Sequence, residues 1–154
     1  MVLRDIWVGE APIDPAALHA AFLAAHSHAG AVVSFTGAVR GHTRDGAIDH
    51  LWLDWYPGMT EASVAAIAQD GEDRFAPAGL MIHHRAGKIA AGEAIVFVAA
   101  ASPHRRAAFE AADYVMDRLK SEAAFWKRET GDGFTRWVEP TAQDRDDLNR
   151  WSRG

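Results

Sequence analysis

The sequence predicts an α+β protein. Short β-rich segments, helical segments begun by capping residues, and a glycine-rich turn between two late strands support this fold class. At 154 residues, with 49% hydrophobic and 24% charged residues, the chain can bury one ordinary core. We expect a single domain over residues 1–140, followed by a polar tail over residues 141–154.

The N-terminal part predicts a strand followed by a helix. Leu3–Val8 is rich in β-forming residues. Asp14 and Pro15 supply an N-cap and a first helical position for an alanine-rich run to His26. His26 and His28 then cap or follow the end of this helix.

Two strands and a second helix come next. Ala31–Val39 and Ile48–Trp55 have strand character, and the polar, glycine-bounded segment Gly41–Gly46 predicts a flexible loop between them. A Pro-Gly turn ends the second strand. Thr60 is a suitable cap for a helix that runs to Arg74.

Another strand pair and the clearest helix follow. Leu80–Arg85 and Ala94–Ala101 predict strands, and the turn around Gly87 and Gly92 favours a hairpin. Ser102-Pro103 is typical of a helix start. The buried face of this helix is predicted to carry Ala108, Ala112, Val115, Met116 and Leu119. The exposed face is predicted to carry Arg106, Glu110, Asp113 and Asp117.

The C-terminal part predicts a hairpin and then a tail. Phe125–Glu129 and Phe134–Val138 flank a Thr-Gly-Asp-Gly turn. After Pro140 the sequence becomes polar, and we expect this tail to fold only against a partner. The tryptophans and Tyr56 fall mostly on strands, which predicts burial in the core or at a subunit interface.

Composition excludes several kinds of chemistry. The chain has no cysteine, so it carries no disulfide, thiolate metal site or thiol nucleophile. Any sulfur must come from another molecule. The net charge of -5 disfavours a general nucleic-acid binder. The longest apolar stretch, Ala94–Ala101, is far too short to span a bilayer, so we expect a cytoplasmic protein with no membrane partner.

Basic residues are the candidates for an anion site. Arg40 follows a predicted strand, and His104 and Arg105 lie in the first helical turn, where cations oppose the helix dipole and suggest a bound anion. Lys120 lies at the C-terminal end of the clearest predicted helix, and Lys127 lies in the strand that follows it. Three of these residues also have a purely structural explanation. The charge of Lys120 would complement the helix dipole, Lys127 would be an outward-facing residue of an alternating strand, and Arg105 would be a solvated surface residue.

Other cofactor patterns are weaker. The pairs His26/His28 and His83/His84 invite a metal hypothesis, but adjacent histidines on a strand point to opposite faces, and HExxH is absent. Neither GxxxxGK[ST] nor GxGxxG is present, so no nucleotide cofactor is implied. Phe35 and Met116 either line a flat heterocycle or belong to the core.

Several segments together resemble the large subunit of molybdopterin synthase, the MoaE family. They are Ser34–Arg40, Leu51–Glu61, His84–Ile89 with Gly92-Glu93, His104-Arg105 with Ala108-Phe109, Lys120, and Phe125–Glu129 followed by Trp137-Val138. Two departures are Asp54, where the family commonly has Glu, and Ala124, where it usually has Pro. The resemblance covers about residues 3–140, which is more specific than any single motif.

The resemblance implies an α/β hammerhead fold with an additional small antiparallel β subdomain. It implies a sulfurtransferase of molybdenum cofactor biosynthesis, built as a homodimer within a heterotetramer. The partner would be a small ubiquitin-like sulfur carrier whose C-terminal Gly-Gly thiocarboxylate supplies the sulfur, and the substrate would be cyclic pyranopterin monophosphate. No metal or cofactor is implied.

The resemblance also implies roles for particular residues. Lys120 and Lys127 would be the catalytic pair. The substrate-binding set would comprise the basic residues Arg40, His104, Arg105 and Arg128, the wall residues Phe35, Val39 and Met116, and also Ala38 and Glu129.

Helix geometry adds one inference. On one straight helix His104 and Lys120 are about 24 Å apart, too far for one small substrate to touch both. We therefore expect a composite site in which a second subunit donates His104 and Arg105. Two other functions stay open: a non-catalytic module that docks an acidic partner tail, and a metal hydrolase that uses the histidines.

Overall fold

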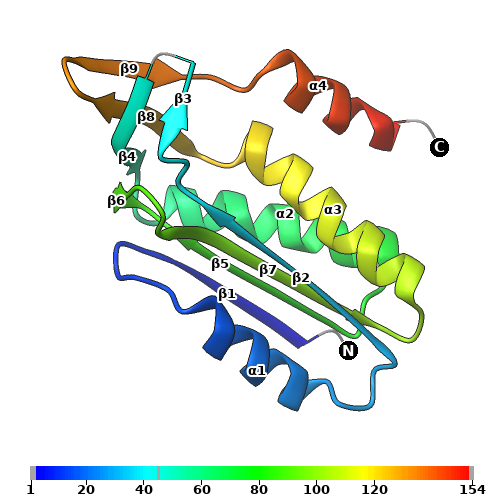
Figure 1. Ribbon diagram of the computed structural model, residues 1–154. Helices are drawn as coiled ribbons and strands as arrows, with labels where there is room; N and C mark the ends of the chain where they lie inside the picture. The colour runs from blue at the N-terminus through cyan, green and yellow to red at the C-terminus, as the bar shows by residue number, and fades with distance from the viewer. Residues whose placement is uncertain (1–2, 45, 153–154) are drawn as a thin grey trace.

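The computed structural model describes residues 3–44 and 46–152, and its first sheet has four strands (Figure 1). In spatial order these are β1 (Leu3–Gly9), β5 (Gly79–Arg85), β7 (Ala94–Ser102) and β2 (Ala31–Ala38). β1 runs parallel to β5, whereas β5, β7 and β2 pair antiparallel. β2 and β1 therefore form the two edges of this sheet.

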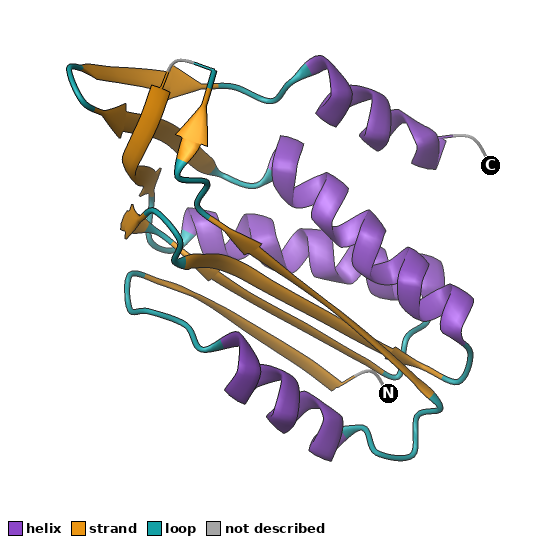
Figure 2. Cartoon of the chain, viewed as in Figure 1, coloured by secondary structure: helices purple, strands orange, loops and turns teal. Residues whose placement is uncertain are grey.

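Helices cover both faces of the first sheet (Figure 2). α1 (Pro15–Ala25) packs on one face, and α2 (Met59–Phe75) and α3 (Arg105–Glu122) pack on the other. β7 is buried on both faces because its residues alternate: Val98 belongs to the cluster under α2 and α3, and Phe97 belongs to the cluster under α1. None of the described helices is long and apolar enough to cross a membrane.

A second, antiparallel sheet lies at one end of the first (Figure 1). It contains β3 (His42–Thr43), β4 (Gly46–Trp55), β8 (Phe125–Gly131) and β9 (Phe134–Val138) in that order, with β6 (Gly87–Ala90) also paired to β4. It has its own apolar cluster, formed by Val39, Ile48, Leu51, Leu53 and Ile89. The predicted α+β class with a small antiparallel subdomain is thus confirmed.

The predicted hairpin between β5 and β7 is only partly right. The two strands do pair, from Gly79 opposite Ala101 to His84 opposite Val96. However, the connection is not a simple turn, because β6 leaves the first sheet and pairs with β4 of the second. Gly87 and Gly92 take positive φ at the two ends of this excursion.

Two predicted helix starts are wrong by a few residues. The N-cap of α2 is Gly58, and Thr60 lies inside the helix, fully buried, where its Oγ1 accepts from the backbone N–H of Tyr56. The N-cap of α3 is His104, because Ser102 still belongs to β7. In both places a tertiary contact or the sheet register outweighs the local capping preference.

The polar tail was predicted to fold only against a partner, and this prediction is wrong, because the tail folds against its own chain. It forms α4 (Ala142–Asn149) and a 3₁₀ turn, η1 (Arg150–Ser152), and packs along α3 (Figure 1). Arg150 and Trp151 both donate to Asp117, which was expected to face water. Residues 153–154 lie outside the described residues.

The loop predicted at Gly41–Gly46 is also more ordered than expected. His42–Thr43 form β3, and Gly46 already belongs to β4. Asp45 lies outside the described residues.

The tryptophans are not core residues of the chain. Trp126 and Trp137 are exposed, and the others are half-buried. Tyr56 is exposed and makes an edge contact with Trp126 at 5.2 Å between ring centroids. The expectation of burial in the core is therefore wrong, whereas burial at a subunit interface stays a prediction.

Candidate active site

The two candidate catalytic lysines lie on either side of a short junction between α3 and β8. Lys120 is in the last turn of α3, and Lys127 is the third residue of β8. The junction is tied to α2: the Thr60 hydroxyl donates to the carbonyl of Ala124 at 2.8 Å, and the Ala124 N–H donates to Ser63 Oγ at 3.0 Å. These bonds hold the path between the lysines without the proline expected at position 124.

Lys127 has an unusual electrostatic environment. Its side chain is half-buried, and burial lowers the pKa of its ammonium. Repulsion from Lys120 lowers this pKa further, and Arg40 acts in the same direction. Glu129, on the same face of β8, opposes the shift. The structure therefore brings Arg40, Lys120, Lys127 and Glu129 together as one predominantly basic cluster.

Arg40 reaches this cluster because the chain leaves β2 just before it. Val39 is buried, and its backbone is bonded on both sides, to Glu93 and to Gly92. The register of β2 shifts between Gly37 and Ala38, so the strand ends in an irregular segment. Ala38 and Arg40 are both exposed at this end, as a binding role requires.

An acidic neighbour of the cluster comes from the tail. Asp144 of α4 lies close enough to Lys127 to raise its pKa, although less than burial lowers it. The Asp144 carboxylate accepts from the Thr141 N–H, and Thr141 Oγ1 accepts from the Asp144 N–H. This capping box is visible in the sequence Thr-Ala-Gln-Asp and could have predicted α4.

Glu129 and Arg128 are both held by partners. Glu129 pairs with Arg136 at 2.9 Å. Arg128 lies on the opposite face of β8 from Lys127, because side chains alternate along a strand. It makes two hydrogen bonds to the Asp54 carboxylate, at 2.8 and 3.0 Å. The structure therefore does not bring Arg128 into the lysine cluster of this chain.

Arg128 instead belongs to an aromatic surface. Its guanidinium lies 5.4 Å from the ring centre of Trp52 and 5.2 Å from that of Trp137. Beside it is an open cleft of about 550 Å³, lined by Glu10, Trp52, Leu53, Asp54, Trp55, Tyr56, Gly87, Trp126 and Trp137. None of the residues that line this cleft was predicted to belong to a site.

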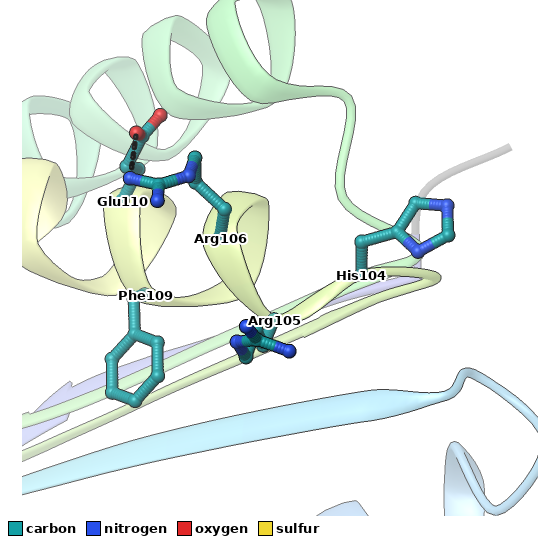
Figure 3. Close-up of a pocket in the computed structure, with 5 residues that line it drawn as sticks. All are labelled: His104, Arg105, Arg106, Phe109 and Glu110. Carbon is teal, nitrogen blue, oxygen red and sulfur yellow. Dashed lines mark ion pairs between the residues drawn. The ribbon is translucent and has the colours of Figure 1, made fainter.

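His104 and Arg105 lie at the other end of α3 from the lysines. Both are exposed and line a shallow hollow of about 480 Å³ with Arg106, Phe109 and Glu110 (Figure 3). Arg105 and Phe109 point to the side of α3 that faces the sheet, whereas Arg106 and Glu110 point away from it. Three basic side chains thus gather around one helix start, and this hollow is a candidate for binding an anion.

The two basic groups are too far apart to act together within one chain. α3 is a single helix, so His104 and Lys120 are separated by about 24 Å along its axis. The candidate wall residues lie between the two groups: Phe35 is 43% exposed on β2, and Met116 is half-buried on α3.

The histidine pairs do not converge. His26 is the C-cap of α1, and His83 and His84 point to opposite faces of β5 as expected. His83 contacts Asp5 at 3.1 Å, and His84 stacks on Phe125 at 4.1 Å. Within the described ranges, no group of three or more His, Asp or Glu side chains could hold a metal ion.

Comparison with known proteins places this chain in a defined class. The family model described as "MoaE protein" matches residues 8–122. A "Molybdopterin synthase catalytic subunit" from Caulobacter vibrioides is 51% identical over 142 residues, covering 92% of this chain and 93% of that protein.

Solved structures agree with this result. A MoaE protein of molybdopterin biosynthesis from Burkholderia ambifaria superposes with a TM-score of 0.81 at 35% identity, covering 99% of this chain and 100% of that one. A chain from a complex of subunits 1 and 2 of molybdopterin-converting factor from Helicobacter pylori has the same fold, with a TM-score of 0.69 at 20% identity over 88% of this chain and 89% of that one.

These similarities extend over almost the whole chain, so they concern the protein and not one motif. The chain belongs to the MoaE family. It is a catalytic subunit of molybdopterin synthase, an enzyme of molybdenum cofactor biosynthesis.

Proposed function

We propose that this subunit transfers sulfur from the C-terminal thiocarboxylate of a small ubiquitin-like carrier subunit to cyclic pyranopterin monophosphate, and so forms the molybdopterin dithiolene. The observation that carries this proposal is the half-buried Lys127, whose pKa is lowered by burial and by the neighbouring ammonium of Lys120. Such a lysine can stabilise an anion as an ammonium, and its lowered pKa makes it a better proton donor than an ordinary lysine.

The chemistry needs these two abilities. Attack by the thiocarboxylate sulfur on a carbonyl carbon of the pterin side chain forms a carbon–sulfur bond, breaks the π bond of that carbon to oxygen and puts the negative charge on the oxygen, which is then protonated and leaves as water. Water then cleaves the acyl–sulfur bond, and the carrier leaves as a carboxylate. Two such transfers, each from one carrier, would supply both sulfur atoms of the dithiolene. Ammonium groups of Lys120 and Lys127 would stabilise the charge that develops in each step, and Lys127, whose pKa is lowered by burial, would transfer the proton.

Composition and similarity both support a separate sulfur carrier. Because the chain has no cysteine, it cannot hold a persulfide, so the sulfur must arrive on another molecule. The relative from Caulobacter vibrioides is named as a subunit, and the Helicobacter pylori fold relative was solved as a complex of two subunits. Both facts support a second subunit here.

The substrate phosphate is assigned to the basic residues outside the lysine pair. Arg40 lies beside the lysines, and His104 with Arg105 would come from a second copy of this chain, because 24 Å separates the two groups in one copy. Phe35, Ala38, Val39 and Met116 would shape the walls. The assembly would then be a homodimer of this subunit with one carrier at each end.

Lysine substitution separates catalysis from carrier binding. Lys120→Ala and Lys127→Ala should each abolish most dithiolene formation when thiocarboxylated carrier and pterin precursor are supplied, while carrier binding measured by calorimetry is retained. Lys88→Ala is the matched control, because Lys88 is an exposed lysine on β6. Full product formation by the Lys127 variant would refute the proposed role, and loss of carrier binding alone would indicate a docking module.

Subunit mixing tests the composite site. His104→Ala and Lys127→Ala proteins should each be inactive, but their mixed dimers contain one site with both native residues. Random mixing should therefore restore about a quarter of the wild-type activity, since half of the dimers are mixed and each has one intact site. Mixtures as inactive as their components would place both residues in the same chain's site.

A further inference from the structure

Two side chains of α2 hold the backbone of Ala124, the residue just before β8. The Thr60 hydroxyl donates to the Ala124 carbonyl at 2.8 Å, and the Ala124 N–H donates to Ser63 Oγ at 3.0 Å. Ser63 Oγ in turn donates to the Thr60 carbonyl at 2.8 Å. Side chains of α2 therefore bind both backbone polar groups of one residue, and this restrains rotation on each side of its Cα.

The Thr60 hydroxyl also joins this junction to the end of β4. It accepts from the Tyr56 N–H at 3.0 Å while it donates to Ala124. Trp55, the last residue of β4, pairs with Phe125, the first residue of β8. One fully buried side chain thus fixes both chain segments beside the last rung of the β4–β8 ladder. A valine of the same shape would leave an N–H and a carbonyl without this partner.

Ala124 lies between the two candidate catalytic lysines. α3 carries Lys120 near its end, and β8 carries Lys127 near its start. Only Ala123 and Ala124 connect the helix to the strand. Rotation about the bonds of either alanine would change the direction in which β8 leaves α3, and so the distance between the two ammonium groups. A misplacement of about 1 Å can lower a catalysed rate by up to about 100-fold.

We propose that Thr60 and Ser63 are positioning residues for the lysine pair, which they align by holding the backbone of Ala124. This role rests on the function proposed above, in which both lysines act on the same substrate. The hydroxyl groups act through the junction, because they are engaged with its backbone and with the first turns of α2. The start of α2 would thus set the geometry of the site as well as cover the first sheet.

The conformation of the junction shows how Ser63 and Ala124 depend on each other. The Phe125 N–H donates to the Ala123 carbonyl at 2.8 Å, which makes a γ-turn centred on Ala124. Among the described non-glycine residues only Ala76 has a positive φ, so this is the inverse γ-turn, whose central φ of about −75° is close to that of proline. Ala123 is extended, with φ −69° and ψ 143°, as a residue before proline prefers.

A proline at position 124 would therefore suit the backbone but would clash with Ser63. Proline replaces the N–H hydrogen with a ring carbon, and in this chain that hydrogen points at Ser63 Oγ, 3.0 Å from the nitrogen. The turn can be held by an N–H with a serine oxygen, or by a proline ring with no oxygen beside it, but not by a mixture of the two. The Ser63–Ala124 hydrogen bond explains how the junction keeps its shape without a proline.

The Thr60 hydroxyl is tested by two opposite substitutions. Thr60→Val keeps the shape and removes the hydroxyl, whereas Thr60→Ser keeps the hydroxyl. The pKa of Lys127, measured by NMR of its labelled side chain, should rise in Thr60→Val, because a displaced Lys127 is less buried and farther from Lys120. Thr60→Ser should have the wild-type value. Thr135→Val makes the same chemical change at an exposed position of β9 and is the matched control, which should leave this pKa unaltered.

A compensating pair of substitutions tests Ser63 without removing the buried hydroxyl. Ser63→Ala loses the bond from the Ala124 N–H, and Ala124→Pro places a ring carbon against Ser63 Oγ. Each single change should raise the Lys127 pKa and lower kcat for dithiolene formation by roughly 10- to 100-fold, with little change in KM. The double variant Ser63→Ala/Ala124→Pro should recover most of both, because its proline ring fits beside the alanine.

The two readouts separate this role from the proposed function. The Lys127 pKa is measured without carrier or pterin, so it reports the positioning alone. A Lys127 pKa that does not rise in Thr60→Val or in Ser63→Ala, or a double variant as impaired as the two single changes combined, would overturn the positioning role. A raised pKa with unchanged product formation would support the positioning role and count against the proposed catalytic role of Lys127.

Discussion

His84 should make the protein sensitive to mild acid. Its ring is buried between β5 and β8 and stacks on Phe125, and burial lowers its pKa to about 4. Nδ1 lies 2.7 Å from the carbonyl oxygen of Arg85, so the neutral ring carries its proton on Nδ1 and donates there. The folded protein therefore holds His84 neutral at pH 7.

The sign of the pH effect follows from this shift. The unfolded chain binds a proton at His84 near its ordinary pKa of 6.5, whereas the folded chain resists protonation until about pH 4. Acid in this window favours the unfolded state. At 1.36 kcal/mol per pKa unit, the folded protein should lose about 3 kcal/mol between pH 6.5 and pH 4, equivalent to about 10 °C in Tm for a chain of this length.

Thermal unfolding of wild type and His84→Leu between pH 7 and pH 4 checks this. The variant loses the bond to Arg85 at every pH, so its Tm should be lower at pH 7 but should fall less steeply with acid. His28→Leu, on an exposed histidine, is the control and should keep the wild-type slope. Parallel curves for wild type and His84→Leu would refute the reasoning.

Three further changes follow from the packing. Trp151→Ala should weaken α4 docking by about 3 kcal/mol, because it removes ring contacts and a bond to Asp117, and should speed amide exchange in α4 by about 100-fold. Lys120→Ala should raise the pKa of Lys127, measured by NMR of its labelled side chain, because one source of repulsion is lost. Gly131→Ala should destabilise the second sheet by about 1–3 kcal/mol in urea unfolding, because its Cβ would lie 2.2 Å from the Ala47 carbonyl oxygen.

Controls for these changes are available in the same elements. Asp146→Ala alters an exposed residue of α4 and should leave its exchange unchanged. Gly41→Ala places a Cβ where no atom lies within 4 Å and should be nearly neutral. Unchanged exchange in Trp151→Ala, a lowered Lys127 pKa, or a Gly131→Ala protein as stable as wild type would each contradict the corresponding contact.

Most elements could be predicted from local patterns, because the residues that determine each of these elements lie within it or next to it in the sequence. The Asp14-Pro15 start of α1 and the β8–β9 hairpin depend on neighbours in sequence, and both were predicted. Thr60 was assigned to the wrong role because its decisive partner, the Ala124 carbonyl, is 64 residues away. β6 was missed for the same reason, since only its pairing with β4 makes it a strand.

The candidate site was predicted in part. The family resemblance assigned Lys127 and Arg128 to one site. Because side chains alternate along a strand, these adjacent residues of β8 point to opposite faces, and the structure separates them. Asp144 could have been found from its capping box, but its approach to Lys127 depends on α4 folding back along α3. That path is set by Trp151 and Asp117, which no local signal connects.

The excursion of β6 has a consequence for how the chain acquires its shape. The segment that joins β5 to β7 must reach β4, and β4 must also receive β8 from beyond α3. Neither sheet can be finished until distant parts of the chain have met. We expect refolding to be slow for a chain of this size. Cleavage of the backbone at a connection between the two sheets should yield fragments that cannot refold separately.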